Sequence, residues 1–343
     1  MYEKNLNKNI QSLVKKYPDK ITVYDQKLHG MMTKNALDLN SMRGVWVGLP
    51  EESYRQILAL SCSSGIKSWM TKSPLTAAYE MGIPIDGDGI IEGTACDKCF
   101  FDRDLFLKTY VGYPKGVNGQ HKAGKEFKAE KESEGFTILS SNDYKNFNSF
   151  GPSIRADKNM IDFWKNCIPQ IAIIVDVDIA DTETGECETI TVKGMLDMVD
   201  FTGDVPTIWD LKSTSDIGGA ESQIWQYGYD IQLALYREFM RIALGIDRIK
   251  TRLLFWDKKE PHDGRIIEPS GIDLNNAKNL FYRAMSEMLK CNEKNYYPRN
   301  LIITTSRRPN YRSLGEEKLS YSEGEKEMAQ HEKARKGVRR EVE

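Results

Sequence analysis

The sequence predicts a mixed α/β (α+β) fold with a central sheet flanked by helices. Three β-rich runs follow one another from Pro169 onward, namely QIAIIVDVDIA, CETITVKGMLDMVDF and PTIWDLKST. The turn-like segment DTETGE separates the first two runs, so a meander is the most economical arrangement. Segments with helical spacing precede and follow these runs, and this order is typical of helices packed around one sheet.

Before the sheet, the sequence predicts a series of helices. LSCSSGIKSWMTKSPLTAAYEMG has serine caps before two short helices, which Pro74 separates. Helical spacing then covers residues 91–110 and 142–166, and the lysine-rich residues 112–135 between them predict a loop and an exposed helix. Residues 1–60 are mixed and contain only short apolar clusters such as GVWVGLP.

After the sheet, ESQIWQYGYDIQLALYREFMRIALG predicts one long amphipathic helix that ends at Gly245. A strand, IKTRLLFWD, and a helix over residues 273–292 follow. The tail from residue 301 is strongly charged and low in apolar residues, which predicts an exposed or partly disordered segment. Docking of this tail to a partner protein is the alternative.

The composition indicates a globular protein with a large core. The chain has 343 residues, of which 40% are hydrophobic and 29% charged, and its formal net charge is −2. This balance shows no global basic field, although an enzyme can still gather lysines and arginines in one groove. We find no run of about 18 apolar residues and no apolar signal-peptide core, so we expect a cytoplasmic protein without a membrane segment.

Six cysteines stand at positions 62, 96, 99, 167, 187 and 291. Cys96 and Cys99 form a C-x-x-C pair, but a zinc or cluster site requires a second close pair, and the other cysteines are scattered singly. We therefore expect reduced thiols that mostly contribute to packing.

The stretch TIWDLKST combines the pattern of a buried strand with two opposite charges. Residues i and i+2 of a strand point to the same face, so Asp210 and Lys212 emerge together, while Trp209 and Leu211 face the other way. A lone D-x-K is most often an ordinary ion pair at a strand end. The residues that lie around Asp210 and Lys212 therefore have to indicate whether this pair has a structural or a chemical role.

A second acid, Asp197, lies on the preceding strand, in KGMLDMVDF. Adjacent antiparallel strands are about 4.8 Å apart, so the carboxylates of Asp197 and Asp210 can converge on one cation. Two carboxylates inside a sheet are costly without a compensating cation or proton. Hard oxygen ligands select Mg²⁺ or Mn²⁺, whereas zinc would require the His or Cys ligands that are missing here.

On the following helix, Gln232 and Tyr236 are spaced i, i+4 and share one face, although ordinary helix surface also explains this spacing. In order along the chain, G-x-x-D (Gly194 to Asp197), D-x-K (Asp210 to Lys212) and Q-x-x-x-Y resemble the RecB-like branch of the PD-(D/E)xK nuclease superfamily. Within that branch, the chain is most similar to phage and prophage exonuclease VIII-type enzymes. LSCSSGIKSWMTKSPLTAAYE, GTACDKCFFD and SSNDYKNFNSFGPSIR are also similar to segments of the family, so the likeness runs from about Leu60 to Pro298.

The resemblance implies a restriction-endonuclease-like core and a metal-dependent DNA phosphodiesterase. Asp197, Asp210 and the backbone carbonyl of Leu211 would hold Mg²⁺, with Mn²⁺ able to substitute. Lys212 would position the attacking water or help to deprotonate it. Gln232 would orient the water or the lysine, and Tyr236 would contact the DNA backbone or brace the site.

One position departs from the family pattern. The family's G-T-A-x-H segment ends in a metal-binding histidine, whereas this chain has Asp97 at that place. A carboxylate can also bind Mg²⁺, so we expect Asp97 to be a further metal ligand. A solvated helix residue, which would leave the metal with fewer protein ligands, is the alternative.

The resemblance further implies an exodeoxyribonuclease that digests double-stranded DNA from its ends, 5′ to 3′, and leaves 3′ strands for a single-strand annealing protein. The ring-shaped oligomers of the family suggest a homo-oligomer, in a bacterial or phage-infected cytoplasm. Lysines in YPKGVNGQHKAGKEFK and arginines in TTSRRPNYR are candidate phosphate contacts, although charge runs are more often solvated surface. An endonuclease of the same fold and a non-catalytic DNA-binding protein are the alternatives.

These observations divide the chain into three parts. Residues 1–60 form an N-terminal extension of unclear role, residues 61–300 form the nuclease domain, and residues 301–343 form the charged tail.

Overall fold

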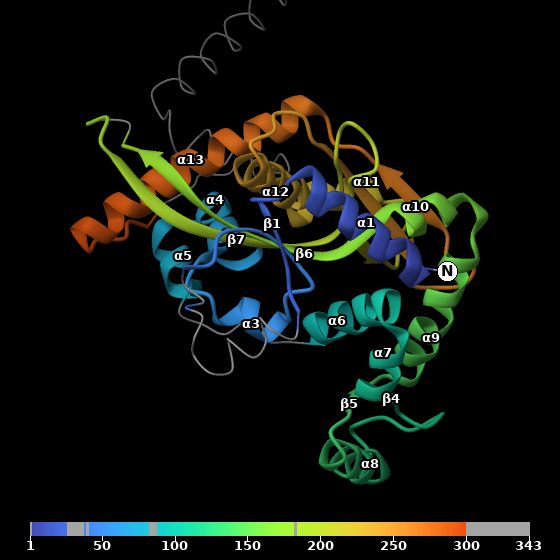
Figure 1. Ribbon diagram of the computed structural model, residues 1–343. Coiled ribbons are helices and arrows are strands. Elements are labelled where there is room, and N and C mark those ends of the chain that lie inside the picture. Colours follow the sequence, from blue (N-terminus) through green and yellow to red (C-terminus); the bar gives the residue numbers. More distant parts are fainter. Residues whose placement is uncertain (1, 26–37, 39–40, 82–87, 182–183, 300–343) are drawn as a thin grey trace, which may run out of the picture.

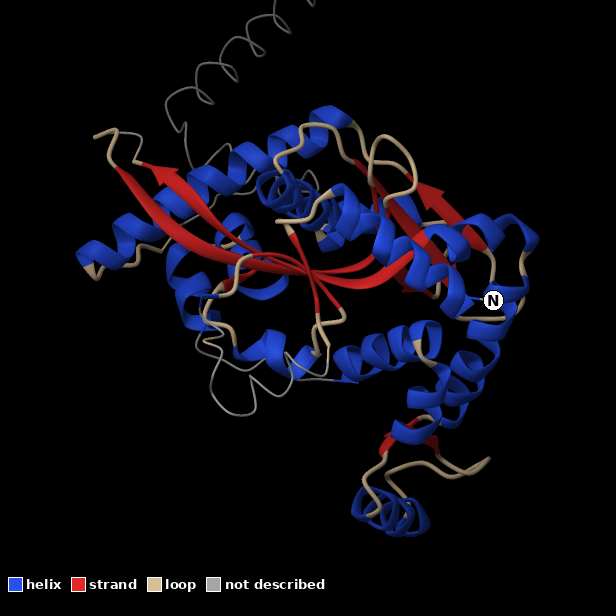
Figure 2. Ribbon diagram, in the orientation of Figure 1, coloured by secondary structure: helices blue, strands red, loops and turns tan. Residues whose placement is uncertain are grey.

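A computed structural model describes residues 2–25, 38, 41–81, 88–181 and 184–299 of the chain. One twisted central sheet has helices on both sides, and a smaller lobe extends from one end of the molecule (Figure 1). Helices and strands of the chain are mixed throughout, with the strands at the centre (Figure 2). The mixed α/β class predicted from the sequence is confirmed.

The central sheet has the strand order β1-β2-β6-β7-β8-β9-β10, and β3 pairs with β7 outside this path. The predicted meander is confirmed, because β6, β7 and β8 are consecutive antiparallel neighbours. The pairs β1/β2, β3/β7 and β8/β9 are parallel. The strands are β1 (Ile21–Val23), β2 (Gly44–Val47), β3 (Leu60–Ser61), β6 (Cys167–Ala180), β7 (Cys187–Asp200), β8 (Thr207–Thr214), β9 (Lys250–Asp257) and β10 (Gly264–Ile267).

Strand β6 shows why the middle of the sheet is the centre of the core. It contains the buried run 171–175 and then alternates buried Val177 and Ile179 with exposed Asp176 and Asp178. A continuous apolar run is expected where both faces of a strand are covered, and alternation where one face meets water. The β6–β7 hairpin therefore passes from the core into solvent, where its far end projects from the molecule (Figure 1).

Several helices pack over one face of the sheet, together with the side chains of Ile208, Leu253 and Phe255. Leu13 of the first helix is fully buried in the same core, and β1 and β2 extend the same sheet. Residues before position 60, whose role the sequence did not indicate, thus build part of the central core. Among these helices are α1 (Tyr2–Lys16), α4 (Lys67–Thr71), α5 (Pro74–Met81), α12 (Tyr229–Leu244) and α13 (Gly271–Lys294).

A second hydrophobic cluster covers the opposite face of the sheet. Trp209 and Leu211 point into it, as the alternation in β8 predicts, and Phe147 and Phe100 face them from helices. This face is covered by α6 (Asp88–Phe101), α7 (Arg103–Thr109), α9 (Ser141–Ala156) and α10 (Ile161–Asn166). Both cysteines of the C-x-x-C pair lie in α6, and five of the six cysteines are buried as free thiols, consistent with the expected packing role.

The smaller lobe consists of β4 (Tyr110–Gly112), β5 (Thr137–Leu139) and α8 (Lys122–Ser133). The two strands form a separate parallel pair, and α8 lies at the end of the lobe, as Figure 1 shows. The predicted loop and exposed helix are confirmed in this segment. The remaining short elements are α3 (Glu51–Gln56), the π-helix η2 (Cys62–Ile66), the 3-10 helix η3 (Lys158–Met160) and α11 (Ala220–Tyr227).

The prediction of one long helix ending at Gly245 is wrong at its middle. The chain forms two helices, α11 and α12, which Gly228 separates with a left-handed φ of 61°. Glycine adopts this conformation without the Cβ clash that other residues meet, so it ends one helix and redirects the chain into the next. Helical periodicity continues through the break, which is why the sequence pattern did not reveal it.

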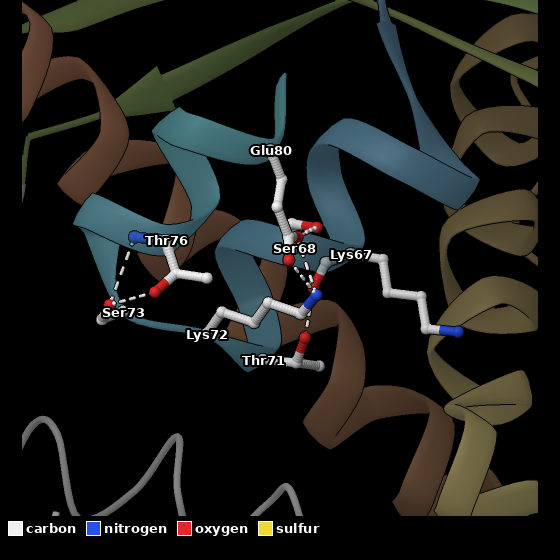
Figure 3. A network of polar contacts seen from close by, with 7 residues as sticks. All are labelled: Lys67, Ser68, Thr71, Lys72, Ser73, Thr76 and Glu80. Atoms are coloured by element: carbon white, nitrogen blue, oxygen red, sulfur yellow. Dashed lines mark hydrogen bonds and ion pairs between the residues drawn. The ribbon is translucent and has the colours of Figure 1, made fainter. Parts of the chain in front are cut away.

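The helical regions before the sheet are confirmed, but two of them are divided: residues 91–110 form α6 and α7, which Asp102 separates, and residues 142–166 form α9, η3 and α10. The π-helix η2 runs directly into α4, and Pro74 is the first residue of α5. Of the expected serine caps, Ser73 accepts a hydrogen bond from the backbone N–H of Thr76 (Figure 3). Ser61 makes no such bond before η2. None of the helices within the described ranges is long and apolar enough to cross a membrane. The predicted tail, residues 301–343, lies outside those ranges.

The packing of α12 on β7 depends on a close approach at Gly194. A Cβ at this position would come within 2.9 Å of Cε1 of Tyr236 and 3.3 Å of Sγ of Cys62. We expect Gly194→Ala to lower the free energy of unfolding by about 1–3 kcal/mol, because the buried ring has little room to move. Chemical denaturation measures the change, with Gly271→Ala as control, since a Cβ at 271 meets nothing within 4 Å. An unchanged denaturation midpoint in Gly194→Ala would contradict the close packing.

Candidate active site

Asp210 and Lys212 of β8 form an ion pair in the interior. Asp210 is fully buried, and its Oδ2 lies 2.6 Å from Nζ of Lys212, which is 15% exposed. The two side chains share one face of the strand, as predicted. Neither oxygen of Asp210 accepts a hydrogen bond of normal geometry within the described part of the chain. Lys212 is therefore the main compensation for a carboxylate that has been removed from water.

Asp197 is attached to the same strand by an unusual backbone contact. The β7/β8 pairing runs from Asp200↔Thr207 to Met198↔Trp209. One residue further along, Oδ2 of Asp197 accepts a hydrogen bond of 2.7 Å from the backbone N–H of Leu211. The side chain thus binds an N–H of the neighbouring strand where the regular pairing ends, and it brings the second acid beside Asp210.

Three acids and one lysine set the electrostatics of the site. Burial raises the pKa of Asp197 well above its usual range, and Asp210 and Asp97 add to this effect. Burial also raises the pKa of Asp97 to about 7, which Lys212 opposes and Asp210 increases. Burial alone would lower the pKa of Lys212, but Asp210 and Asp197 outweigh it and hold that pKa above its usual value. The cluster therefore carries more potential negative charge than Lys212 alone neutralises.

Gln232 and Tyr236 are joined to each other and to the G-x-x-D segment. Nε2 of Gln232 donates a 2.8 Å hydrogen bond to Oη of Tyr236, and the tyrosine ring packs against Gly194. Burial raises the pKa of Tyr236 well above its usual value, and it is only 4% exposed. Of the two roles expected for Tyr236, bracing fits this geometry, whereas a DNA contact would require the ring to leave the core.

Two residues near the site were not singled out from the sequence. The ring of Tyr229, at the start of α12, has its centroid 4.8 Å from Nζ of Lys212. Lys67, at the start of α4, donates a hydrogen bond to the carbonyl of Tyr227 at the end of α11. Both stand inside quoted motifs, in GYDIQLALY and SSGIKSW, but only the break at Gly228 brings them beside the D-x-K strand.

The donor set fits a hard divalent cation held partly by water and substrate. No three His, Cys, Asp or Glu side chains in the described ranges converge as a ready-made metal site. Mg²⁺ is commonly held by one or two carboxylates, with waters and phosphate oxygens completing its shell. The buried oxygens of Asp210 and the excess of carboxylates over lysine match this kind of site. Asp97 lies within electrostatic range of Asp210 and Lys212, which is where a further ligand would be needed.

An acid on each of two neighbouring strands, with a lysine two residues after the second, defines a core of the PD-(D/E)xK nuclease class. The chain matches the family described as PDDEXK-like domain of unknown function (DUF3799) over residues 78–301. This match spans more than half of the chain, so the protein belongs to that family. The superfamily expected from the sequence, and with it the enzyme class of a nuclease, is confirmed.

Solved structures also share similarity with the chain. A protein named "Putative exonuclease" from Eubacterium rectale is 17% identical, with a TM-score of 0.49 over 77% of this chain and 96% of that one. A phage related exonuclease from Haemophilus somnus is 14% identical, with a TM-score of 0.27 over 69% and 96%. An alkaline exonuclease from Laribacter hongkongensis is 15% identical, with a TM-score of 0.26 over 58% and 95%. At these values the likeness carries no argument about the reaction.

Among curated proteins, none matches this chain in sequence.

The raised pKa of Asp97 predicts that the free energy of unfolding of the metal-free protein decreases as the pH rises. The folded-state pKa of about 7 exceeds the unfolded value of about 3.9, so the folded chain retains this proton better. The contribution of Asp97 to stability is therefore complete below about pH 4 and is lost as the pH rises through 7. Asp97→Asn cannot ionise, and we expect it to raise the melting temperature in EDTA more at pH 8 than at pH 5.

Thermal unfolding of both proteins at the two pH values measures this difference. Asp178→Asn, at an exposed position of β6, serves as the control and should show no such pH dependence. Equal shifts of the melting temperature at pH 5 and pH 8 for Asp97→Asn would contradict the raised pKa.

Proposed function

We propose that the protein is a Mg²⁺-dependent exodeoxyribonuclease that hydrolyses double-stranded DNA from its ends. The observation that carries the proposal is the convergence of Asp197, Asp210 and Lys212, from two neighbouring strands, in a fold of the PDDEXK-like family. These residues combine carboxylates for a divalent cation with an ammonium for the reacting phosphate, which is the chemistry that phosphodiester hydrolysis requires.

Asp197 and Asp210, the backbone carbonyl of Leu211 and Asp97 would hold the metal. When bound, a divalent metal supplies a water of lowered pKa and offsets charge that develops on the phosphate. Asp197 is already oriented by the N–H of Leu211, so it needs little rearrangement to present its second oxygen. Catalysis benefits when the ligating groups are positioned before the substrate arrives.

Lys212 has two roles in this proposal, one without a metal and one with a metal bound. In the metal-free protein its ammonium compensates Asp210, and the ring of Tyr229 lies over it. With a cation held at Asp210, the ammonium of Lys212 would be available to orient the attacking water or to contact a phosphate oxygen. Gln232 would orient Tyr236 and through it the G-x-x-D strand, which makes these two residues positioning groups in the proposal.

The finer features of the proposal rest on the family resemblance of the sequence. They are digestion in the 5′ to 3′ direction, release of 3′ strands to a single-strand annealing partner, a homo-oligomeric assembly and a place in the cytoplasm of a bacterium or phage-infected cell. Mn²⁺ is expected to replace Mg²⁺. An endonuclease of the same fold would use the same groups, and it differs in cutting closed circular DNA.

Removal of either member of the ion pair should abolish hydrolysis. We expect Asp210→Asn and Lys212→Met to lower the rate on linear duplex DNA by at least about a hundredfold, because one loses a metal ligand and the other an ammonium at the phosphate. Gel analysis of linear and closed circular duplexes measures both the loss and the end requirement. Asp178→Asn and Lys250→Met, exposed positions of β6 and β9, are matched controls that should keep activity.

Activity of either site variant within a few-fold of the unmodified protein would overturn the assignment of the site. Cutting of closed circles as fast as linear DNA would replace the exonuclease by an endonuclease.

The cation dependence should follow from the all-oxygen ligand set. Activity should be lost in EDTA and return with Mg²⁺ or Mn²⁺, but not with Ca²⁺, whose larger and looser coordination shell positions water poorly. Asp97→Asn should raise the Mg²⁺ concentration needed for half-maximal activity. Asp97→His should raise this concentration less, since imidazole can also bind the metal. Superimposable Mg²⁺ titrations of the unmodified protein and Asp97→Asn would show that Asp97 is no ligand.

A further inference from the structure

Lys67 is a second lysine directed toward the site from outside the D-x-K strand. In Figure 3 its side chain extends away from the contacts that Ser68, Lys72 and Glu80 make with one another. Its ammonium donates to the carbonyl of Tyr227, which uses one of its three N–H donors. The other donors remain suitable for an anion at the same place.

The absence of a side chain at Gly228 allows this position of Lys67. A Cβ at 228 would come within 3.1 Å of Cε and 3.6 Å of Nζ of Lys67. The left-handed φ of 61° that breaks α11 from α12 thus also makes room for the lysine. The same break places Tyr227 and Tyr229 on either side of the glycine.

Lys67 and Lys212 belong to one electrostatic environment. Burial lowers the pKa of Lys67, the charge of Lys212 lowers it further, and Asp210 and Asp230 oppose this effect. Lys67 therefore adds a second ammonium in the electrostatic surroundings of Lys212, and an ammonium is a suitable hydrogen-bond donor to a backbone phosphate.

A short series of aromatic rings leads from Lys212 to the surface. The ring of Tyr229 lies 4.8 Å from Nζ of Lys212, and its centroid is 5.7 Å from that of Tyr227. Tyr227 is 47% exposed, so its ring is accessible to a ligand at the surface next to the buried ion pair. An exposed ring beside a cationic phosphate site is the combination by which proteins bind single nucleic-acid strands.

We propose that Lys67 and Tyr227 form a strand-binding step beside the candidate active site, and that it accepts one unpaired nucleic-acid strand. Lys67 binds a backbone phosphate next to the scissile one, and the ring of Tyr227 stacks on the base of an adjoining nucleotide. The inference rests on the proposed nuclease function and adds that, at an end of the duplex, the strand to be cut reaches the site unpaired. Within a duplex the faces of a base are covered by its stacked neighbours, so a stacking side chain of this kind takes an unpaired base.

Binding without hydrolysis tests the step. In an Asp210→Asn background with EDTA, fluorescence anisotropy gives the Kd for a short labelled single-stranded DNA over a range of salt concentrations. We expect Lys67→Met and Tyr227→Ala each to raise the Kd about tenfold, and Tyr227→Phe and Lys67→Arg to stay near the parent. Only Lys67→Met should also lower the slope of log affinity against log salt, by about 0.7 for the one phosphate that the variant no longer neutralises. A perfect hairpin duplex should show a smaller effect of Tyr227→Ala.

Two matched variants control for general surface effects. Lys72→Met removes a lysine at the end of α4, and the ammonium of this lysine contacts Glu80 instead of the site. Tyr79→Ala removes an aromatic ring of α5 that is 71% exposed. Both should leave the Kd for the single strand unchanged. Thermal unfolding verifies that each variant is folded, and because Tyr227 is exposed, its alanine variant tests the step even if Lys67→Met is unstable.

Parent-like Kd values and salt slopes in folded Lys67→Met and Tyr227→Ala would overturn the strand-binding step. Hydrolysis of linear duplex DNA by the unmodified protein with Mg²⁺ is measured in parallel. Metal-dependent hydrolysis together with parent-like binding refutes the step alone, whereas no hydrolysis under any metal refutes the proposed function on which it rests.

Discussion

The buried ion pair between Asp210 and Lys212 is the constraint around which the site is arranged. A carboxylate without water needs a counter-charge, and removing one partner of such a pair costs about 3–5 kcal/mol because the other charge stays buried. Lys212 meets this need at 2.6 Å, and Tyr229 covers the ammonium. Asp197 adds a second acid to the same place, so Lys212 alone does not balance the negative charge that the cluster can carry. In the proposed function, a divalent cation would balance this charge and would also supply the metal chemistry.

The three short motifs that suggested a nuclease are also one packing unit. Gly194 admits the ring of Tyr236, whose hydroxyl accepts the hydrogen bond of Gln232. Three residues after this glycine, Asp197 binds the N–H of Leu211 on the next strand. The spacing within each motif therefore has a structural reason. Gly194 and Tyr236 let α12 pack closely on β7, and the side chain of Asp197 connects β7 to β8 by a hydrogen bond. Chemistry and packing share the same backbone positions.

The break at Gly228 has consequences beyond helix geometry. It turns the exposed end of α11 toward the site, and it leaves space for Lys67 to approach from a distant part of the sequence. Lys67 and Tyr227 are 160 positions apart along the chain and meet through one hydrogen bond. A residue with a Cβ at this corner would disturb both the left-handed turn and the position of the lysine.

Sequence alone determined the fold class and the meander, because strand alternation and helical spacing are local properties of the chain, and it predicted the acids and the lysine of the candidate site. It also placed Asp210 and Lys212 on one face, which the structure confirms. Tertiary structure decided what depends on contacts between distant segments. The contact of Asp197 with the N–H of Leu211 arises where regular pairing of two strands ends. The left-handed turn at Gly228 is invisible to helical periodicity, since a glycine within an amphipathic run is compatible with either a continuous or a broken helix, and only packing against the sheet selects between them.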